Sequence, residues 1–308
     1  MSTLEESAVT PAQKRTPVTI AKATLKQLRP KQWAKNVFLF AAIVFSGRFT
    51  DPTAIVQVLV GFFSFSMLAS SGYIFNDYLD READRKHPKK KFRPIASGAL
   101  PAPMALVLMV ACLASGVASA LWLSQWFLLI ALAYLSTTLS YSFYFKHIVI
   151  LDVMFLASGF VWRAIAGAIA IDVRTSVWLF LCTAFVALFF GFGKRRAELL
   201  QLGAEGGTRK NLAEYTGKML EQYLNIVTGA TVLCYALYCA LGPTPWMTLT
   251  VPFVLYLVFR YIYLVERFGE GGAPDETLLG DWPILFAGAL YGLSAIGVML
   301  LNNAGVLP

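Results

Sequence analysis

The chain has 308 residues, of which 57% are hydrophobic and only 14% are charged. Soluble domains carry roughly 25% charged residues. The apolar residues form long runs nearly free of charge, each close to the ~20 residues that a helix needs to cross about 30 Å of hydrocarbon. These features exclude a soluble globular enzyme and predict an integral membrane protein.

The N-terminal residues differ from the rest of the chain. Residues 1–20 contain no long apolar stretch, which predicts a flexible cytoplasmic tail without a cleavable signal peptide. Residues 21–308 are expected to form a single transmembrane domain.

Apolar runs bounded by charge, proline or glycine predict nine membrane spans. They are too long for barrel strands and lack a two-residue alternation, so the predicted fold class is all-α, a bundle of nine transmembrane helices. The spans lie at approximately 34–50, 54–75, 103–123, 125–145, 148–170, 175–193, 222–242, 247–265 and 283–303.

The distribution of lysine and arginine predicts the orientation. With Arg163 and Arg260 inside spans, only Arg48 and Arg174 fall on the side opposite the N-terminus. The positive-inside rule therefore places the N-terminus in the cytoplasm and the C-terminus outside. The net charge of +8 follows from the same bias, and nucleic-acid binding is not expected.

A cluster of acids ends the second predicted span. At 100° per residue, Asn76, Asp77, Asp80 and Asp84 share one quadrant of a helix. Carboxylates this close repel unless a cation neutralises them, and oxygen ligands suit a hard ion such as Mg²⁺. The pattern predicts a magnesium site, and removal of one acid is expected to raise stability slightly without Mg²⁺.

The alternative is a solvated helix end whose acids pair with Arg81, Arg85 and Lys86. A basic loop that includes Lys91 and Arg93 follows directly. Mg²⁺ can bridge diphosphate oxygens while lysine and arginine neutralise the remaining charge. The acids and the loop together predict a polyphosphate site, with Arg85, Lys91 and Arg93 as substrate-binding residues.

The pattern Asn-Asp-x-x-Asp-x-x-x-Asp at residues 76–84 resembles the UbiA superfamily of intramembrane prenyltransferases. The resemblance implies that these residues bind Mg²⁺ and the diphosphate of a donor, with Asp77, Asp80 and Asp84 catalytic. A narrower resemblance, to the decaprenyl-phosphate phosphoribosyltransferases of that superfamily, rests on residues 28–36, 87–96, 158–167 and 193–199. It implies phosphoribosyl diphosphate as donor and polyprenyl phosphate as acceptor, at the cytoplasmic face of a bacterial inner membrane, for arabinose supply to the cell envelope.

One segment departs from the superfamily pattern. A second Asp-x-x-x-Asp motif usually follows span six, whereas this chain has Lys194-Arg195-Arg196-Ala197-Glu198. The extra cations suit a donor with an additional phosphate, so Lys194 and Arg195 are predicted to bind substrate and Glu198 to be catalytic. The alternatives are a positive-inside anchor and an ion pair between Glu198 and Lys194.

Two charged residues are predicted within span five. Asp152 and Arg163 lie eleven residues apart and therefore face the same way. Charged residues in membranes usually face the bundle interior. We expect Asp152 beside the metal cluster and Arg163 on a phosphate; the alternative is that each pairs with a neighbouring helix.

The remaining candidates come from spans one and four. Tyr141 and Lys146 resemble the Tyr and Lys that help to bind donor diphosphate in the superfamily, although Lys146 could equally snorkel to the interface. Lys31, Lys35 and Asn36 begin span one at the same level and are also predicted to bind substrate. A prenyltransferase acting on an aromatic acceptor and an anion transporter are the alternative functions, and a homo-oligomer is left open.

Overall fold

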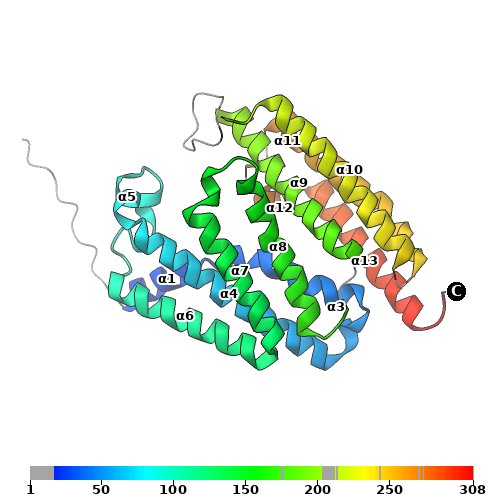
Figure 1. The fold of residues 1–308 in the computed structure, drawn as a ribbon, viewed down its shortest axis with the longest axis horizontal. Coiled ribbons are helices and arrows are strands. Elements are labelled where there is room, and N and C mark those ends of the chain that lie inside the picture. The colour runs from blue at the N-terminus through cyan, green and yellow to red at the C-terminus, as the bar shows by residue number, and fades with distance from the viewer. Residues whose placement is uncertain are drawn as a thin grey trace, which may run out of the picture.

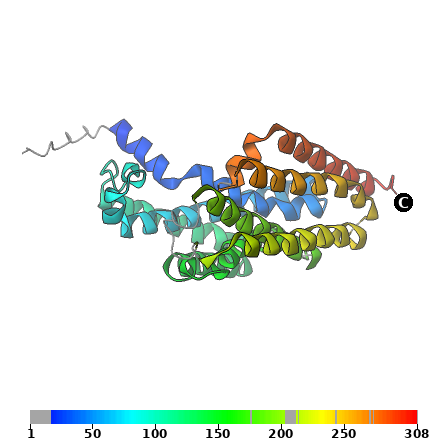
Figure 2. The ribbon, with the colours of Figure 1, turned by 90° about the horizontal axis from the view of Figure 1, so that it is seen from above.

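The computed structural model describes residues 17–174, 177–202, 212, 214–242, 244–269, 271–272 and 274–307. These residues contain helices and no strands, which confirms the all-α prediction (Figures 1 and 2). The elements are α1 (Pro17–Leu28), α2 (Pro30–Trp33), η1 (Ala34–Phe40), α3 (Ala41–Phe45), η2 (Arg48–Thr50), α4 (Pro52–Leu79), α5 (Arg81–Lys86), η3 (Lys90–Phe92), α6 (Ala102–Leu123), α7 (Gln125–Phe143), η4 (Phe145–His147), α8 (Leu151–Ala170), α9 (Val177–Leu202), α10 (Gly217–Leu241), η6 (Pro245–Thr250), α11 (Val251–Phe268), α12 (Pro274–Gly280) and α13 (Trp282–Asn303).

Seven helical segments within the described residues are long and apolar enough to cross a membrane. They correspond to predicted spans two to five and seven to nine, and α9 covers the sixth. The first predicted span, 34–50, is instead divided among η1, α3 and η2. The protein is a multi-span membrane protein, and a count of nine is consistent with these segments but is not exactly reproduced.

Close backbone packing accompanies the break in the first span. A Cβ atom on Gly167 of α8 would overlap the carbonyl oxygen of Leu39 in η1. Leu39 is fully buried, and the neighbouring Asn36 donates to Ser66 Oγ of α4 at 2.9 Å. These contacts hold a 3₁₀ segment inside the bundle, where hydropathy alone predicts a continuous helix.

The N-terminal boundary also differs from the prediction. Residues 17–20 of the predicted tail belong to α1, while residues 1–16 lie outside the described part of the chain. Helix α1 packs its buried Ala23 and Gln27 toward the bundle and leaves Val18 and Leu25 exposed.

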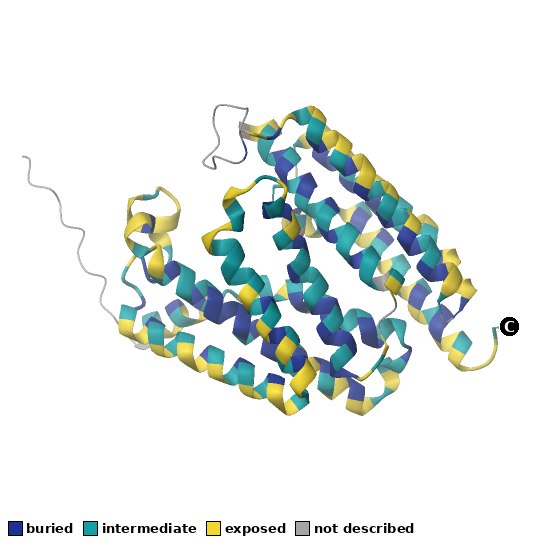
Figure 3. Ribbon diagram, viewed as in Figure 1, coloured by how far each residue is buried: buried dark blue, intermediate teal, exposed yellow. Residues whose placement is uncertain are grey.

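Burial follows the arrangement expected of a membrane bundle. Buried residues line the contacts between helices, and exposed residues follow the outer faces (Figure 3). Large apolar side chains such as Trp122 and Trp126 are 66% and 72% exposed, which suits contact with lipid. Ser64 of α4 donates to the Gly116 carbonyl of α6 at 2.8 Å, a polar contact that small residues allow between close helices.

Candidate active site

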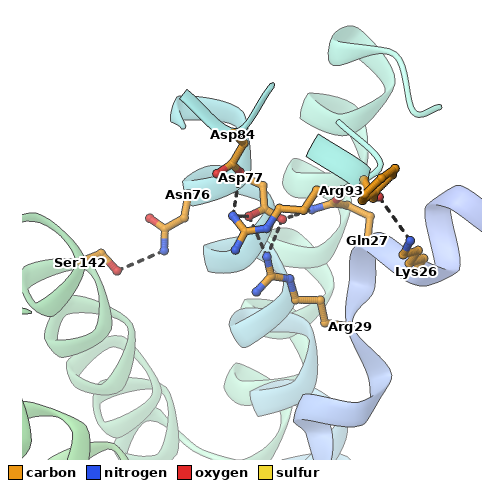
Figure 4. A network of polar contacts seen from close by, with 9 residues as sticks. Lys26, Gln27, Arg29, Asn76, Asp77, Asp84, Arg93 and Ser142 are labelled. Carbon is orange, nitrogen blue, oxygen red and sulfur yellow. Dashed lines mark hydrogen bonds and ion pairs between the residues drawn. The ribbon is translucent and has the colours of Figure 1, made fainter. Parts of the chain in front are cut away.

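Two of the predicted metal ligands form a buried acidic pair. Asp77 lies near the end of α4 and Asp84 lies in α5, and each is only 3% exposed. Helical hydrogen bonding continues across the junction, because the Asp84 amide donates to the Asp80 carbonyl at 2.8 Å. Arg93 Nη1 donates to Asp77 Oδ1 at 2.9 Å and to Asp84 Oδ2 at 2.7 Å (Figure 4). One guanidinium nitrogen therefore lies between the two carboxylates.

Asp77 accepts further hydrogen bonds from the N-terminal helices. Gln27 Nε2 of α1 donates at 2.8 Å, and Arg29 Nη2 donates to both carboxylate oxygens at 2.7 Å. Arg29 connects α1 to α2 with φ 54°, in the left-handed region. Gln27 was not among the predicted residues, and the only sequence signal for Arg29 was its place in the block at 28–36.

Asp77 and Asp84 do not pair with the cations that the solvated-end alternative names. Arg85 is exposed and binds Glu82 at 2.9 Å and the Ala96 carbonyl at 3.1 Å. Arg81 donates to the Tyr78 carbonyl at 2.7 Å. The partners of Asp77 and Asp84 come instead from the segments before α2 and after η3, which the fold brings together.

The other two predicted ligands lie differently. Asp80 is exposed, and Asn76 Nδ2 donates to Ser142 Oγ of α7 at 3.1 Å. Within the described ranges, no group of three or more histidine, cysteine or acidic side chains is arranged so that it could hold a metal ion. Asp77 and Asp84 supply the oxygen ligands that a hard divalent cation prefers, and together they already bind one cationic group. A third carboxylate ligand requires the side chain of Asp80 to turn inward.

The second predicted cluster contains a buried ion pair. Arg195 of α9 donates from Nε to Asp152 Oδ2 of α8 at 2.7 Å and from Nη1 to Glu198 Oε2 at 2.6 Å. The side chains of Arg195 and Asp152 are 1% and 0% exposed. Asp152 thus contacts Arg195, not the acidic pair beside which we expected it, and Glu198 contacts Arg195 in place of the i,i+4 partner Lys194.

The end of α7 lies between the two clusters. Ser142 accepts from Asn76, and the adjacent Tyr141 is close enough to Arg195 for an electrostatic interaction. Lys146 follows in η4 and is half-buried, as are Lys35 and Lys194, and each of the three makes a polar, ring or electrostatic contact. Lys31 and Lys91 are exposed.

Arg163 is held entirely by uncharged groups. Its three nitrogens donate to Asn36 Oδ1 at 2.7 Å, the Gly159 carbonyl at 2.7 Å and Tyr134 Oη at 2.9 Å. The guanidinium also lies over the Tyr134 ring, 4.7 Å from its centroid. This network follows the alternative in which Arg163 joins neighbouring elements, here η1, α7 and α8, and a role on phosphate stays a prediction.

Glu198→Gln is expected to reduce turnover about tenfold or more, because a hydrogen bond to a charged group contributes about 1.5–3 kcal/mol. The amide oxygen of glutamine can still accept a hydrogen bond from Arg195, but the negative charge of the glutamate is lost. Steady-state kinetics would measure the change. The matched control is Glu266→Gln, because Glu266 of α11 accepts at 3.0 Å from Arg196, the residue that follows Arg195 in α9. An equal loss in both variants would contradict a specific role for Glu198.

Known proteins share both the fold of this chain and the sequence pattern of these residues. The chain belongs to the UbiA prenyltransferase family, whose model matches residues 36–273. A protein from Corynebacterium glutamicum named decaprenyl-phosphate phosphoribosyltransferase is 37% identical over 277 residues, covering 86% of this chain and 83% of its own. One of the same name from Mycobacterium tuberculosis is 34% identical over 290 residues, covering 91% and 95%.

Solved structures share the architecture. A UbiA homologue from Archaeoglobus fulgidus bound to GPP and Mg²⁺ superposes with a TM-score of 0.71 at 19% identity, over 90% of this chain and 99% of its own. A digeranylgeranylglyceryl phosphate synthase superposes with a TM-score of 0.67 at 18% identity, over 91% and 98%. At these identities the likeness shows the fold alone.

Proposed function

We propose that the protein transfers a phosphoribosyl group from 5-phosphoribosyl 1-diphosphate to polyprenyl phosphate, releasing pyrophosphate. The names of relatives that align with most of the chain support this function. The strongest structural support for this function is the position of Arg195, which is buried beside Asp152 and Glu198 in a segment with two further cations. Arg195 keeps one buried nitrogen, Nη2, without a partner among the described residues, and this suits a donor with one more phosphate than a prenyl diphosphate has.

The acids of the first cluster are proposed to hold Mg²⁺ through Asp77 and Asp84, with Asn76 and Asp80 completing the set. Mg²⁺ held by these residues would supply neutralisation of the charge that develops on the departing diphosphate. Arg29 and Arg93 already lie on the same carboxylates, so their guanidinium groups are placed to donate to diphosphate oxygens as well.

The acceptor needs little activation in this reaction. A phosphate oxygen of the lipid is ionised at neutral pH and displaces pyrophosphate from the anomeric carbon through an oxocarbenium-like transition state. The site residues then act by positioning the two anions and by stabilising charge, with no strong general base. The active site is proposed to face the cytoplasm at a bacterial inner membrane, in agreement with the basic residues around it.

Incubation of the purified protein with Mg²⁺, radiolabelled phosphoribosyl diphosphate and a polyprenyl phosphate tests the function. We expect label in the lipid fraction and release of one pyrophosphate for each transfer. The second candidate is a prenyltransferase acting on an aromatic acceptor, an activity that the UbiA prenyltransferase family also covers. Transfer from a prenyl diphosphate to an aromatic acid, without labelling of the lipid phosphate, would establish that candidate instead.

Lys194→Ala is expected to raise the KM for phosphoribosyl diphosphate far more than the KM for the lipid, because it removes a cation from the proposed donor site. Lys194→Asp should weaken donor binding further by adding negative charge. Lys218→Ala, which removes an exposed cation from the start of α10, is the matched control. Equal effects of Lys194→Ala on both substrates would indicate a structural anchor.

A further inference from the structure

A strained turn precedes α8. Ile150 has φ 69° and ψ −50°, and the amide of Leu151 donates to the Val149 carbonyl at 2.8 Å, which defines a γ-turn centred on Ile150. A β-branched residue rarely adopts positive φ, and such conformations persist only where surrounding contacts enforce them. The turn directs the first residues of α8, including Asp152.

Tyr215 supplies the contact that holds this turn. It lies just before α10, and its hydroxyl accepts from the Ile150 amide at 2.7 Å. The same hydroxyl donates to Asp152 Oδ1 at 2.8 Å. Burial raises the pKa of Tyr215, so the phenol retains the proton that it donates. One side chain therefore connects the strained turn to the carboxylate two residues later.

The connection continues to Arg195. Asp152 uses its other oxygen, Oδ2, to accept from Arg195 Nε, and Glu198 accepts from Nη1. Arg195 Nη2 is buried and has no hydrogen-bond partner among the described residues. A buried donor without a partner is costly, and a guanidinium that lacks one acceptor is suited to an anionic oxygen.

The surroundings of Arg195 indicate where such an anion would lie. Tyr141 interacts electrostatically with Arg195, and the neighbouring Ser142 contacts Asn76 beside the acidic pair. Two adjacent residues at the end of α7 thus interact, one with the guanidinium and the other with a residue of the proposed diphosphate site.

We propose that Tyr215 is a positioning residue that acts through Asp152 to aim the Nη2 group of Arg195 at a phosphate oxygen of the phosphoribosyl donor. The role rests on the proposed function, because it names that donor. Nothing in the sequence motifs identifies Tyr215, which precedes a predicted span and is separated by 63 residues from Asp152.

Tyr215→Phe tests the role, since the ring can keep its packing in the apolar cluster while the hydroxyl is lost. We expect the KM for phosphoribosyl diphosphate to rise about tenfold, the scale of one lost charge-assisted contact. The KM for polyprenyl phosphate and kcat should stay within about twofold. Tyr223→Phe is the matched control, because Tyr223 packs against the same cluster through Phe192, at a centroid distance of 5.2 Å, and should change neither constant.

A double-mutant cycle with Arg195→Lys separates positioning from packing. If Tyr215 acts through Arg195, adding Tyr215→Phe to Arg195→Lys should change the donor KM by less than about twofold. Additive effects, equal effects on both substrates, or a fall in thermal stability with unchanged donor KM would each overturn the positioning role. If the wild type uses phosphoribosyl diphosphate and Tyr215→Phe behaves like Tyr223→Phe, the role alone fails. If the wild type does not use this donor, the proposed function fails and the role with it.

Discussion

Asp77→Asn is expected to abolish turnover and to lower the thermal stability of the metal-free protein. The carboxylate accepts from Gln27, Arg29 and Arg93 and is almost fully buried. An amide removes the negative charge and places an N–H₂ group against these donors. Breaking a buried ion pair costs about 3 kcal/mol or more, although the partly exposed arginines reduce that figure here. Thermal unfolding in detergent with a chelator would measure the stability, and pyrophosphate release the turnover.

Repulsion among the acids predicts that removing one of them raises the stability of the metal-free protein. The contacts of Asp77 in the structure predict the opposite effect. Arg29 and Arg93 already neutralise Asp77, so removing its charge leaves Arg29 without its carboxylate partner and Arg93 with Asp84 alone. Asp80→Asn is the matched comparison, because Asp80 is exposed. It should abolish turnover if Asp80 completes the metal site, yet leave the metal-free stability unchanged. Retained activity in Asp80→Asn would contradict its place in the site.

Gly167→Ala is expected to destabilise the protein by about 2–3 kcal/mol, the cost of overpacking a close contact. The added methyl group would overlap the Leu39 carbonyl oxygen, which belongs to backbone and cannot rotate away. Displacing η1 would also lengthen the 2.7 Å hydrogen bond from Arg163 to Asn36 and leave the Arg163 charge less well solvated. Thermal unfolding in detergent would measure the loss.

Gly229→Ala is the control for the same substitution within a helix. Apart from the neighbouring backbone of its own helix, no atom lies within 4 Å of a Cβ at Gly229, so alanine meets open space there. Replacing a helical glycine by alanine then favours the helix by up to about 1 kcal/mol. If Gly167→Ala were as stable as Gly229→Ala, the close approach of η1 to α8 would be wrong.

Much of the fold follows from hydropathy because each span must satisfy its own backbone hydrogen bonds in lipid. Helices α4, α6, α7 and α8 accordingly lie close to their predicted ranges. The first predicted span is the exception. Its division among η1, α3 and η2 accompanies the contact of Leu39 with Gly167 and the hydrogen bond from Arg163 to Asn36, which join segments more than 100 residues apart. Hydropathy carries no information on such contacts.

The site divides in the same way. The spacing of Asp77, Asp80 and Asp84 is local, so helical geometry predicts from sequence that they share a face. Their partners are not local: Arg29 and Arg93 reach Asp77 from separate segments, and Asp152 meets Arg195 across two helices. The sequence by itself determined the membrane class, the helical spans and the acidic face, since these depend on neighbouring residues. Only the tertiary structure decided which charges meet, because buried charges pair with the cations that packing brings near, at whatever distance along the chain.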